Sequence, residues 1–364
     1  MINKLVIENL KHRWVRTLLS AAAVGVQVTM ILTLVGISFG MLDDMGRRSR
    51  GAGADILIRP PGSSIISMST APMPEKILEF VNSLPHVALA TGTTVQPIGG
   101  SNSVTGIDLD AFSRMSGGFR YAAGGPFQNP DDVIVDEYWA RQNGLRVGSK
   151  MQFMNREWYV RGIVEPGKLA RLFVPIRLLQ ELSANTGKLT MVYVKLDDPA
   201  HLQATIASIK AQLPDYQIFS IDEYVSLISI NNVPGLKAFI VVVIGVSVIV
   251  GFLVVFLSMY TAVLERTREI GVLKSLGASP GFVLNILVRE TVVLALVGSA
   301  IGIALSFATR WAIMNFVPGS LSQMIVPQWW PIATLVSLVG SLLGALYPGW
   351  KAARQDAIEA LAYE

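Results

Sequence analysis

The sequence predicts a membrane protein with four transmembrane α-helices, one N-terminal and three C-terminal, and an α+β extracytoplasmic domain inserted between the first and the second. Three observations lead to this fold class. Only 15% of the 364 residues are Asp, Glu, Lys or Arg, and 51% are hydrophobic, whereas soluble proteins carry about 25% charged residues. The missing charges leave uncharged stretches of about 20 residues or more, the length with which a helix crosses a bilayer. Between the first two stretches, charge returns to the density of a soluble domain.

The expected spans are centred on stretches in which charged residues are missing, and the third of these stretches is 291–309. They are predicted at residues 17–42, 238–264, 281–310 and 331–348. The uncharged stretch 311–350 is too long for one crossing, and Pro318, Gly319 and Pro327 interrupt it, so the fourth span is placed after these residues. The first span is much longer than the apolar region of a cleavable signal peptide, and we expect it to remain as an anchor.

Four crossings place both termini on one side of the membrane and residues 43–236 on the other. Ten Lys and Arg residues flank the spans on the side of the termini, and six flank them on the opposite side. Because positive charge in short flanks favours the cytoplasm, we expect cytoplasmic termini, an inner-membrane location and an extracytoplasmic domain at 43–236. Arg47, Arg48 and Arg50 argue against this orientation. The net charge of +4 is thus assigned to helix flanks, and no nucleic-acid partner is expected.

The two ends of the chain are expected on the cytoplasmic side. Within residues 1–16, the apolar side chains of Ile2, Val6, Leu10 and Trp14 recur at intervals of four, which predicts an amphipathic helix in the membrane interface that contacts lipid. A frayed basic tail is the alternative. Residues 349–364 are expected to form a cytoplasmic C-terminal tail.

Residues 43–236 mix strand and helix patterns without strict alternation, which favours an α+β domain. Strands are predicted at 55–58, 133–135, 151–154, 158–164 and 191–195. Helices are predicted at 74–82, 137–143, 175–182 and 199–212, and Asp198 is expected to cap the last of these.

Residues 265–280, between the second and third spans, predict a short amphipathic helix. Glu265 with Arg268, and Arg266 with Glu269, are spaced to pair on a helix. This helix is either a connector lying on the membrane surface or a lever that docks into a partner protein and transmits its motion to the two spans.

The second half of this segment carries an apolar stripe and a pair of helix-boundary signals. The stripe consists of Val272, Leu273 and Leu276. Gly277 has the position of a helix C-cap, and Ser279 followed by Pro280 indicates the start of the next helix.

Several further segments occur in the order expected of one known family. They are residues 9–19, 132–137, 144–148, 161–167, 265–279 and 347–361. Together they resemble the FtsX-like permeases of ABC transporters, with a MacB-like periplasmic core domain at 43–236 and an FtsX-like permease domain at 237–364. Ala357 stands where the family commonly has proline, which puts the local bend of the tail in doubt.

The resemblance implies a permease subunit that works as a homodimer with an ABC ATPase subunit, in mechanotransmission-type export, with a periplasmic adaptor as a further partner. The residues implied to contact the ATPase are Glu265, Arg266, Arg268, Glu269, Leu273 and Lys274. No cofactor is expected in this chain, because ATP and Mg would be bound by the ATPase, and no Gly-x-x-x-x-Gly-Lys-[Ser/Thr] motif occurs in it. A non-transporting regulator or sensor that controls a periplasmic partner is the alternative.

Three of the spans carry a pair of glycines four residues apart, which predicts close helix packing. These pairs are Gly36 and Gly40, Gly298 and Gly302, and Gly340 and Gly344.

Neither catalysis nor metal binding is predicted. The three histidines, His12, His86 and His201, are scattered along the sequence, so no zinc motif is present, and there is no Gly-x-Ser-x-Gly elbow. The spans lack charged residues near their middles, which argues against transport along a polar path through the bilayer.

Overall fold

The computed structural model of the chain describes residues 8–9, 11, 14–63, 71–99, 102–229, 232, 235–317 and 322–355. Most of the helix predicted at 1–16, and the tail beyond Gln355, lie outside the described residues. The chain divides into two compact units. The helical unit comprises Met1–Phe39, Gly235–Met314 and Gln323–Glu364, and the sheet unit comprises Gly40–Pro234 and Asn315–Ser322.

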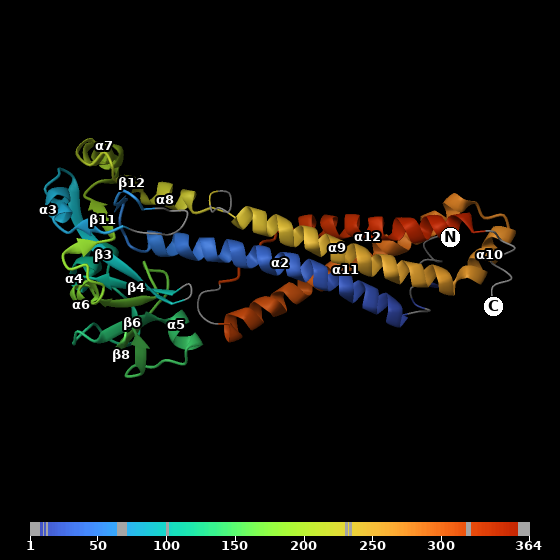
Figure 1. Ribbon diagram of the computed structural model, residues 1–364, viewed down its shortest axis with the longest axis horizontal. Helices are drawn as coiled ribbons and strands as arrows, with labels where there is room; N and C mark the ends of the chain where they lie inside the picture. Colours follow the sequence, from blue (N-terminus) through green and yellow to red (C-terminus); the bar gives the residue numbers. More distant parts are fainter. Residues whose placement is uncertain are drawn as a thin grey trace. The chain divides into compact units, whose positions relative to one another are not determined.

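Four long helices account for most of the helical unit, and each has the length and composition needed to cross a membrane. They are α2 (Trp14–Arg50), α9 (Leu236–Glu265), α11 (Pro280–Phe316) and α12 (Trp329–Arg354), and the short helix α10 (Thr267–Ser275) connects α9 to α11. Figure 1 shows α12 running beside α9, and α11 crossing α2.

Helix α2 continues past the apolar stretch that predicted it, and its last part, from Gly40, belongs to the sheet unit. There Arg47 pairs with Asp43 and Arg48 pairs with Asp44, each at 3.2 Å. An acidic residue one turn before a basic residue stabilises a helix in water. Hydropathy therefore locates the apolar part of this helix but not its end.

Helices α2 and α11 approach each other at glycines. A Cβ atom added at Gly298 would lie 2.6 Å from the Cβ of Val24, and one added at Gly302 would lie 2.6 Å from the Cβ of Val28. Real Cβ atoms do not come this close, so neither position has room for a larger residue. Such small residues let helix backbones meet where lipid surrounds the bundle.

Helices α9 and α12 meet in a similar way. A Cβ atom at Gly344 would lie 2.7 Å from the carbonyl oxygen of Phe252. One turn earlier, a Cβ atom at Gly340 would lie 3.6 Å from Val248, which is ordinary contact. The two glycines of this pair therefore differ in how tightly they are packed.

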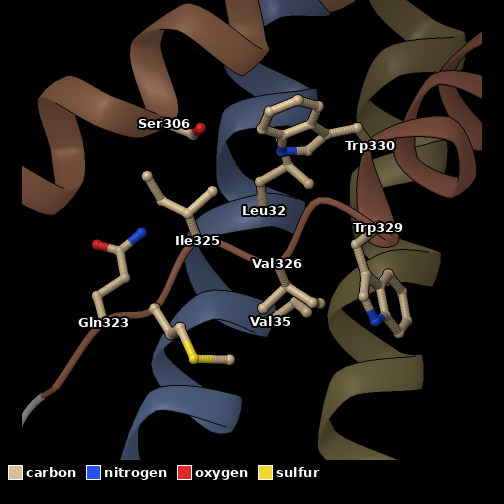
Figure 2. Close-up of a pocket in the computed structure, with 9 residues that line it drawn as sticks. Leu32, Val35, Ser306, Gln323, Ile325, Val326, Trp329 and Trp330 are labelled. Carbon is tan, nitrogen blue, oxygen red and sulfur yellow. The ribbon is translucent and has the colours of Figure 1, made fainter.

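A non-helical segment leads into α12 and packs on α2. The backbone N–H of Met324 donates to the carbonyl of Gly36 at 3.0 Å, so this glycine contacts a loop. Gly40, one turn further along α2, is buried. Beside the loop lies a cavity of about 10 Å³, bordered by Leu32 and Gln323 among others and shown in Figure 2. It has room for about one water molecule.

Polar side chains are buried between the helices. The hydroxyl groups of Ser299 on α11 and Ser337 on α12 share a hydrogen bond of 3.0 Å. Gln27 on α2 is 3% exposed and packs against Gly251 on α9, and its amide has no hydrogen-bond partner among the described residues. The bundle is thus joined by small polar groups as well as by close backbone contacts.

The sheet unit is built on a ten-stranded sheet. Nine of its strands have the order β12-β1-β11-β3-β4-β9-β6-β8-β5, and the tenth, β7, pairs with β8. Strands β10 and β2 form a separate two-stranded sheet. The strands are β1 (Ile56–Arg59), β2 (Met73–Pro74), β3 (Val87–Gly99), β4 (Asn102–Ile107), β5 (Tyr121–Gly124), β6 (Asp132–Asp136), β7 (Lys150–Phe153), β8 (Arg156–Val164), β9 (Leu172–Pro175), β10 (Lys188–Leu189), β11 (Met191–Leu196) and β12 (Gln217–Ser220). Pairs β4-β9 and β6-β8 are parallel, so the sheet is mixed.

Short helices connect these strands. They are α3 (Ile77–Asn82), α4 (Leu109–Ser116), α5 (Glu137–Gln142), α6 (Ile176–Leu182), the 3-10 helix η1 (Pro199–His201), α7 (Leu202–Gln212) and α8 (Ile221–Leu227). The Asp198 carboxylate accepts a hydrogen bond from the N–H of Ala200, as its position before Pro199 predicted. The predicted fold class, with one N-terminal and three C-terminal apolar helices around an α+β domain, is confirmed.

Four apolar clusters of described residues fill the sheet unit, and two of them are larger than the others. One is formed mainly by β1, β11, α3 and α7 and includes the fully buried Ile56 and Ile209. The other surrounds Trp158, whose ring stacks on Phe153 at 4.8 Å and whose indole N–H donates to the Phe153 carbonyl. Large side chains therefore form the interior of this unit.

A charge cluster fixes the end of α2 within the sheet unit. Arg171 contacts Asp44 at 2.8 Å and Asp136 at 3.9 Å, and Arg48 pairs with the same Asp44. Asp136 also accepts a hydrogen bond from the backbone N–H of Trp139, which caps α5. Burial raises the pKa of Asp136 to about 6, against the opposing effects of that hydrogen bond and of Arg171.

Candidate coupling site at helix α10

Helix α10 is bounded by well-defined ends. The N–H of Ala278 donates to the carbonyl of Leu273 and that of Gly277 to Lys274, each at 3.0 Å, which is a Schellman motif. Gly277 has a φ of 96°, a conformation that other residues adopt with strain. The Ser279 hydroxyl accepts a hydrogen bond from the N–H of Phe282 and caps α11. The predicted C-cap and N-cap are both confirmed.

A buried ion pair holds the start of α10. The Arg266 guanidinium contacts both oxygens of Glu290 on α11, at 3.1 and 3.4 Å, and the two side chains are 7% and 2% exposed. Arg266 also donates to the backbone carbonyl of Asn9 at 3.2 Å. The predicted pairing of Arg266 with Glu269 is wrong, because the Arg266 side chain points into the bundle and finds its partner there.

Arg16 on α2 completes this network. It contacts Glu265 at 3.0 Å and Glu290 at 3.8 Å, so the Glu290 carboxylate faces two guanidinium groups. Glu290 was not among the predicted site residues. Its signal in the sequence is a carboxylate close to the apolar stretch of the third span, where charge is costly and tends to be functional or paired.

The far end of α10 is tied to α12. The ammonium group of Lys274 donates to the Ala353 carbonyl at 3.0 Å and also to the carbonyl of Gln355. These acceptors lie at the C-terminal end of α12, where unpaired carbonyls and the helix dipole favour a cation. Lys274 therefore has an intramolecular role in this structure.

Among the described residues, the opposite face of α10 has no contacts of comparable extent. Thr267, Ile270 and Gly271 are buried against the bundle, and Leu273 is half-buried. The outward side chains, which we call the outer face of α10, are Arg268, Glu269, Val272 and Leu276. Val272 is 44% exposed and Leu276 is 79% exposed. Leu276 was predicted as part of the apolar stripe but not as a contact residue.

Two of the three histidines are neighbours in the sheet unit, although they are far apart in the sequence. The rings of His86 and His201 stack at 3.6 Å, and His86 lies 3.4 Å from Asp197. His12 lies outside the described residues. Across the described part of the chain, no group of three or more His, Cys, Asp or Glu residues is placed to hold a metal ion.

Family models match both parts of the chain. The MacB-like periplasmic core domain matches residues 17–212, and the C-terminal domain of the FtsX-like permeases matches residues 241–357. The second match contains α10 and the helices to which it is tied.

Curated relatives agree with these matches. The chain is 29% identical over 207 residues to the uncharacterized ABC transporter permease YknZ of Bacillus subtilis, which covers 54% of the chain and 50% of the relative. It is 22% identical over 394 residues to the macrolide export ATP-binding/permease protein MacB of Escherichia coli, which covers 99% of the chain and 60% of the relative. The chain thus spans about half to three-fifths of the length of these relatives.

A solved structure is similar to part of the chain. The periplasmic region of MacB from Actinobacillus actinomycetemcomitans aligns with a TM-score of 0.37 and 16% identity, over 48% of this chain and 92% of that chain. The family itself rests on the sequence models, one of which alone matches more than half of the chain. The resemblance seen in the sequence is confirmed, and the chain belongs to the MacB/FtsX-like family of ABC transporter permeases.

Proposed function

We propose that this chain is the permease subunit of an ABC transporter in which a separate ATPase subunit, holding ATP and Mg, moves the extracytoplasmic domain by mechanotransmission to drive export. Family membership supports the permease part of this proposal. The MacB relatives are named as combined ATP-binding and permease proteins, whereas the 364 residues of this chain contain no P-loop motif. In this proposal the ATPase site lies in another polypeptide, and the working unit is two copies of the chain with a periplasmic adaptor.

The observation that carries the proposal is the contrast between the two faces of α10. Its inner side is tied to α11 through Arg266 and Glu290, and to α12 through Lys274. A force applied to the outer face would therefore act on the membrane helices directly, since both ends of α10 are attached to them by polar contacts. A connector that only lies on the membrane surface needs no such attachments.

The outer face also has the composition of a contact surface. Exposed apolar side chains beside charged ones are typical of the centre and rim of protein interfaces. Val272 and Leu276 supply the apolar centre, and Arg268 and Glu269 supply the charges. We therefore place the ATPase contact on these four residues with Leu273, and assign Arg266 and Lys274 to positioning α10. An ATPase contact at α10 would put this helix and both termini in the cytoplasm, and we include this orientation in the proposal.

The test is Leu276→Asp, assayed with the ATPase subunit that co-purifies with the natural chain. A charge in the apolar centre should weaken assembly by about 2 kcal/mol or more, roughly a thirtyfold loss. Co-purification of the ATPase and ATP hydrolysis by the reconstituted complex are the measurements. Leu276 is largely exposed, so the variant should still fold and insert into the membrane.

Val147→Asp is the matched control, because Val147 is an exposed apolar residue of the sheet unit, 41% exposed. It should leave assembly and ATP hydrolysis unchanged. Normal assembly and hydrolysis in the Leu276→Asp variant would contradict the assignment of α10 as the coupling element.

A further inference from the structure

The C-terminal half of α12 borders an apolar groove. The groove has a volume of about 450 Å³ and is lined by Leu284 of α11 and by Leu346, Tyr347 and Trp350 of α12. The three α12 side chains are half-exposed, between 49% and 54%. None of the four side chains carries a charge, so the groove suits a hydrocarbon chain.

An aromatic row continues this surface onto α9. The ring of Tyr347 lies 6.0 Å from that of Phe256, which in turn neighbours Tyr260 at 6.1 Å. Tyrosine and tryptophan concentrate where a membrane helix passes from hydrocarbon to headgroups. The groove therefore has the chemistry of the outer edge of a bilayer leaflet.

Two cations follow the groove on the same face of α12. Tyr347, Trp350, Lys351 and Arg354 are spaced at i, i+3, i+4 and i+7, which places them on one side of a helix. At 1.5 Å per residue, Arg354 lies about 10 Å beyond Tyr347 along the helix axis. The cations thus follow the aromatic residues along α12 in the order in which a phosphate follows the acyl chains of a phospholipid, and at a comparable distance.

Aromatic rings hold both cations without neutralising them. The Lys351 ammonium lies 5.1 Å from the ring centre of Tyr260, and the Arg354 guanidinium lies 4.4 Å from that of Trp350. Over the residues that the structure describes, no carboxylate lies within 4 Å of either cation. Lys274 adds a third positive charge at this end of α12.

We propose that this groove binds one anionic phospholipid, with an acyl chain against Leu284 and Trp350 and its phosphate on Lys351 and Arg354. The ligand must carry an apolar chain and an anion in one molecule, and anionic lipids of the surrounding leaflet have both. Basic pockets between membrane helices recognise such headgroups. A neutral lipid offers the two cations no net negative charge, and an acidic protein surface would leave the groove unfilled.

Native mass spectrometry of the full-length chain, released from detergent with added lipid, tests the site. The probes are palmitoyl-oleoyl phosphatidylglycerol and palmitoyl-oleoyl phosphatidylcholine, which differ in headgroup charge but not in their chains. The first phosphatidylglycerol molecule should bind roughly 25-fold more tightly than the first phosphatidylcholine, since each of the two cations near an anionic headgroup contributes about a fivefold preference.

Two variants and a control locate the preference. The double variant Lys351→Gln with Arg354→Gln should remove the preference for phosphatidylglycerol. Leu346→Trp, which fills the groove from an exposed position, should weaken the binding of both lipids. The matched control is Lys237→Gln with Arg310→Gln, which removes the same charge from exposed positions on α9 and α11 and should keep the preference.

The outcomes separate the lipid site from other occupants. Equal affinity of the natural chain for the two lipids would overturn the proposal. So would a Lys351/Arg354 double variant that keeps the lipid preference but loses the ATPase or dimerisation, because the cations would then serve a protein partner. No ATPase is needed for the lipid measurement, so a failure of the proposed transport function would leave this result standing.

Discussion

In the helical unit glycines let the backbones of neighbouring helices meet, whereas the interior of the sheet unit is filled by large side chains. Gly298 and Gly302 bring α11 against α2, and the fully buried Trp158 and Phe173 lie in the sheet unit. When two helices associate in lipid, contacts between side chains and lipid tails are replaced by similar contacts between side chains. Close approach of the helix backbones therefore decides stability. In water, burial of apolar surface decides it, at about 25 cal/mol per Å².

Buried charge differs between the two units in a similar way. In the helical unit, Glu290 is held between Arg266 and Arg16, and the network fixes α10. In the sheet unit, Asp136 faces Arg171 only at 3.9 Å, and its pKa rises to about 6. Burial penalises the Asp136 carboxylate, and each of the two sites has its own experimental signature.

The largest expected effect comes from removing the shared carboxylate. Glu290→Leu leaves Arg266 buried without its close partner, and such a loss costs about 3–5 kcal/mol of unfolding free energy. The double variant Glu290→Leu with Arg266→Leu should recover most of this loss. The natural chain and the variants form a double-mutant cycle, and the free energy of unfolding of each is measured in detergent micelles by SDS titration.

The matched control is the exposed pair of the sheet unit, Arg50 and Asp222, at 3.1 Å. Asp222→Ala should cost no more than about 1 kcal/mol, because exposed ion pairs contribute little. Similar costs at Glu290 and Asp222 would show that the buried network does not hold α10.

A pH titration sharpens the comparison in the sheet unit. The Asp136 pKa lies at about 6 in the folded chain and at 3.8 ordinarily, so the folded state binds this proton more tightly. The stabilising contribution is therefore complete below pH 3.8 and is lost as the pH rises through 6, by roughly 3 kcal/mol in total. Hydrogen exchange of β6 and α5 amides at pH 4.5 and pH 7, corrected for intrinsic rates, measures it.

Asp136→Asn should flatten this dependence, because the amide does not titrate and can still accept the capping hydrogen bond from Trp139. An unchanged pH dependence in this variant would assign the effect to another group of the sheet unit.

Enlarging a glycine should give the smallest of these effects and the most specific one. Gly302→Val places its side chain on Val28 and the Gly25 carbonyl, and overpacking of this kind costs about 1–3 kcal/mol. Gly245→Val is the control, because a Cβ atom at Gly245 of α9 meets nothing within 4 Å. Equal thermal stability of the two variants in detergent would refute the importance of the α2-α11 contact.

The sequence predicted most of what hydropathy and local signals determine. The four spans were predicted from missing charge. The C-terminal end of α10 was predicted from Gly277, and the start of α11 from Ser279. Strands β3 and β4, at the middle of the sheet, were not predicted. Gly92 and Pro97 disfavour a strand locally, and β3 forms because β11 and β4 pair with it on both sides.

The candidate site was predicted only in part, for a related reason. Spacing along one helix suggested a partner for Arg266 three residues away, but its actual partner, Glu290, comes from the next helix. The exposure of Leu276 and the burial of Arg266 likewise depend on the bundle beneath α10. The position of α10 is thus a local property of the sequence, whereas the division of its residues between two faces depends on the tertiary structure.

That division has a consequence for engineering. The residues that hold α10 in place and the residues that it presents outward are different, so the outer face can be exchanged without disturbing the bundle. Transplanting Arg268, Glu269, Val272 and Leu276 from one member of the family to another should therefore redirect the choice of ATPase while the recipient keeps its own fold.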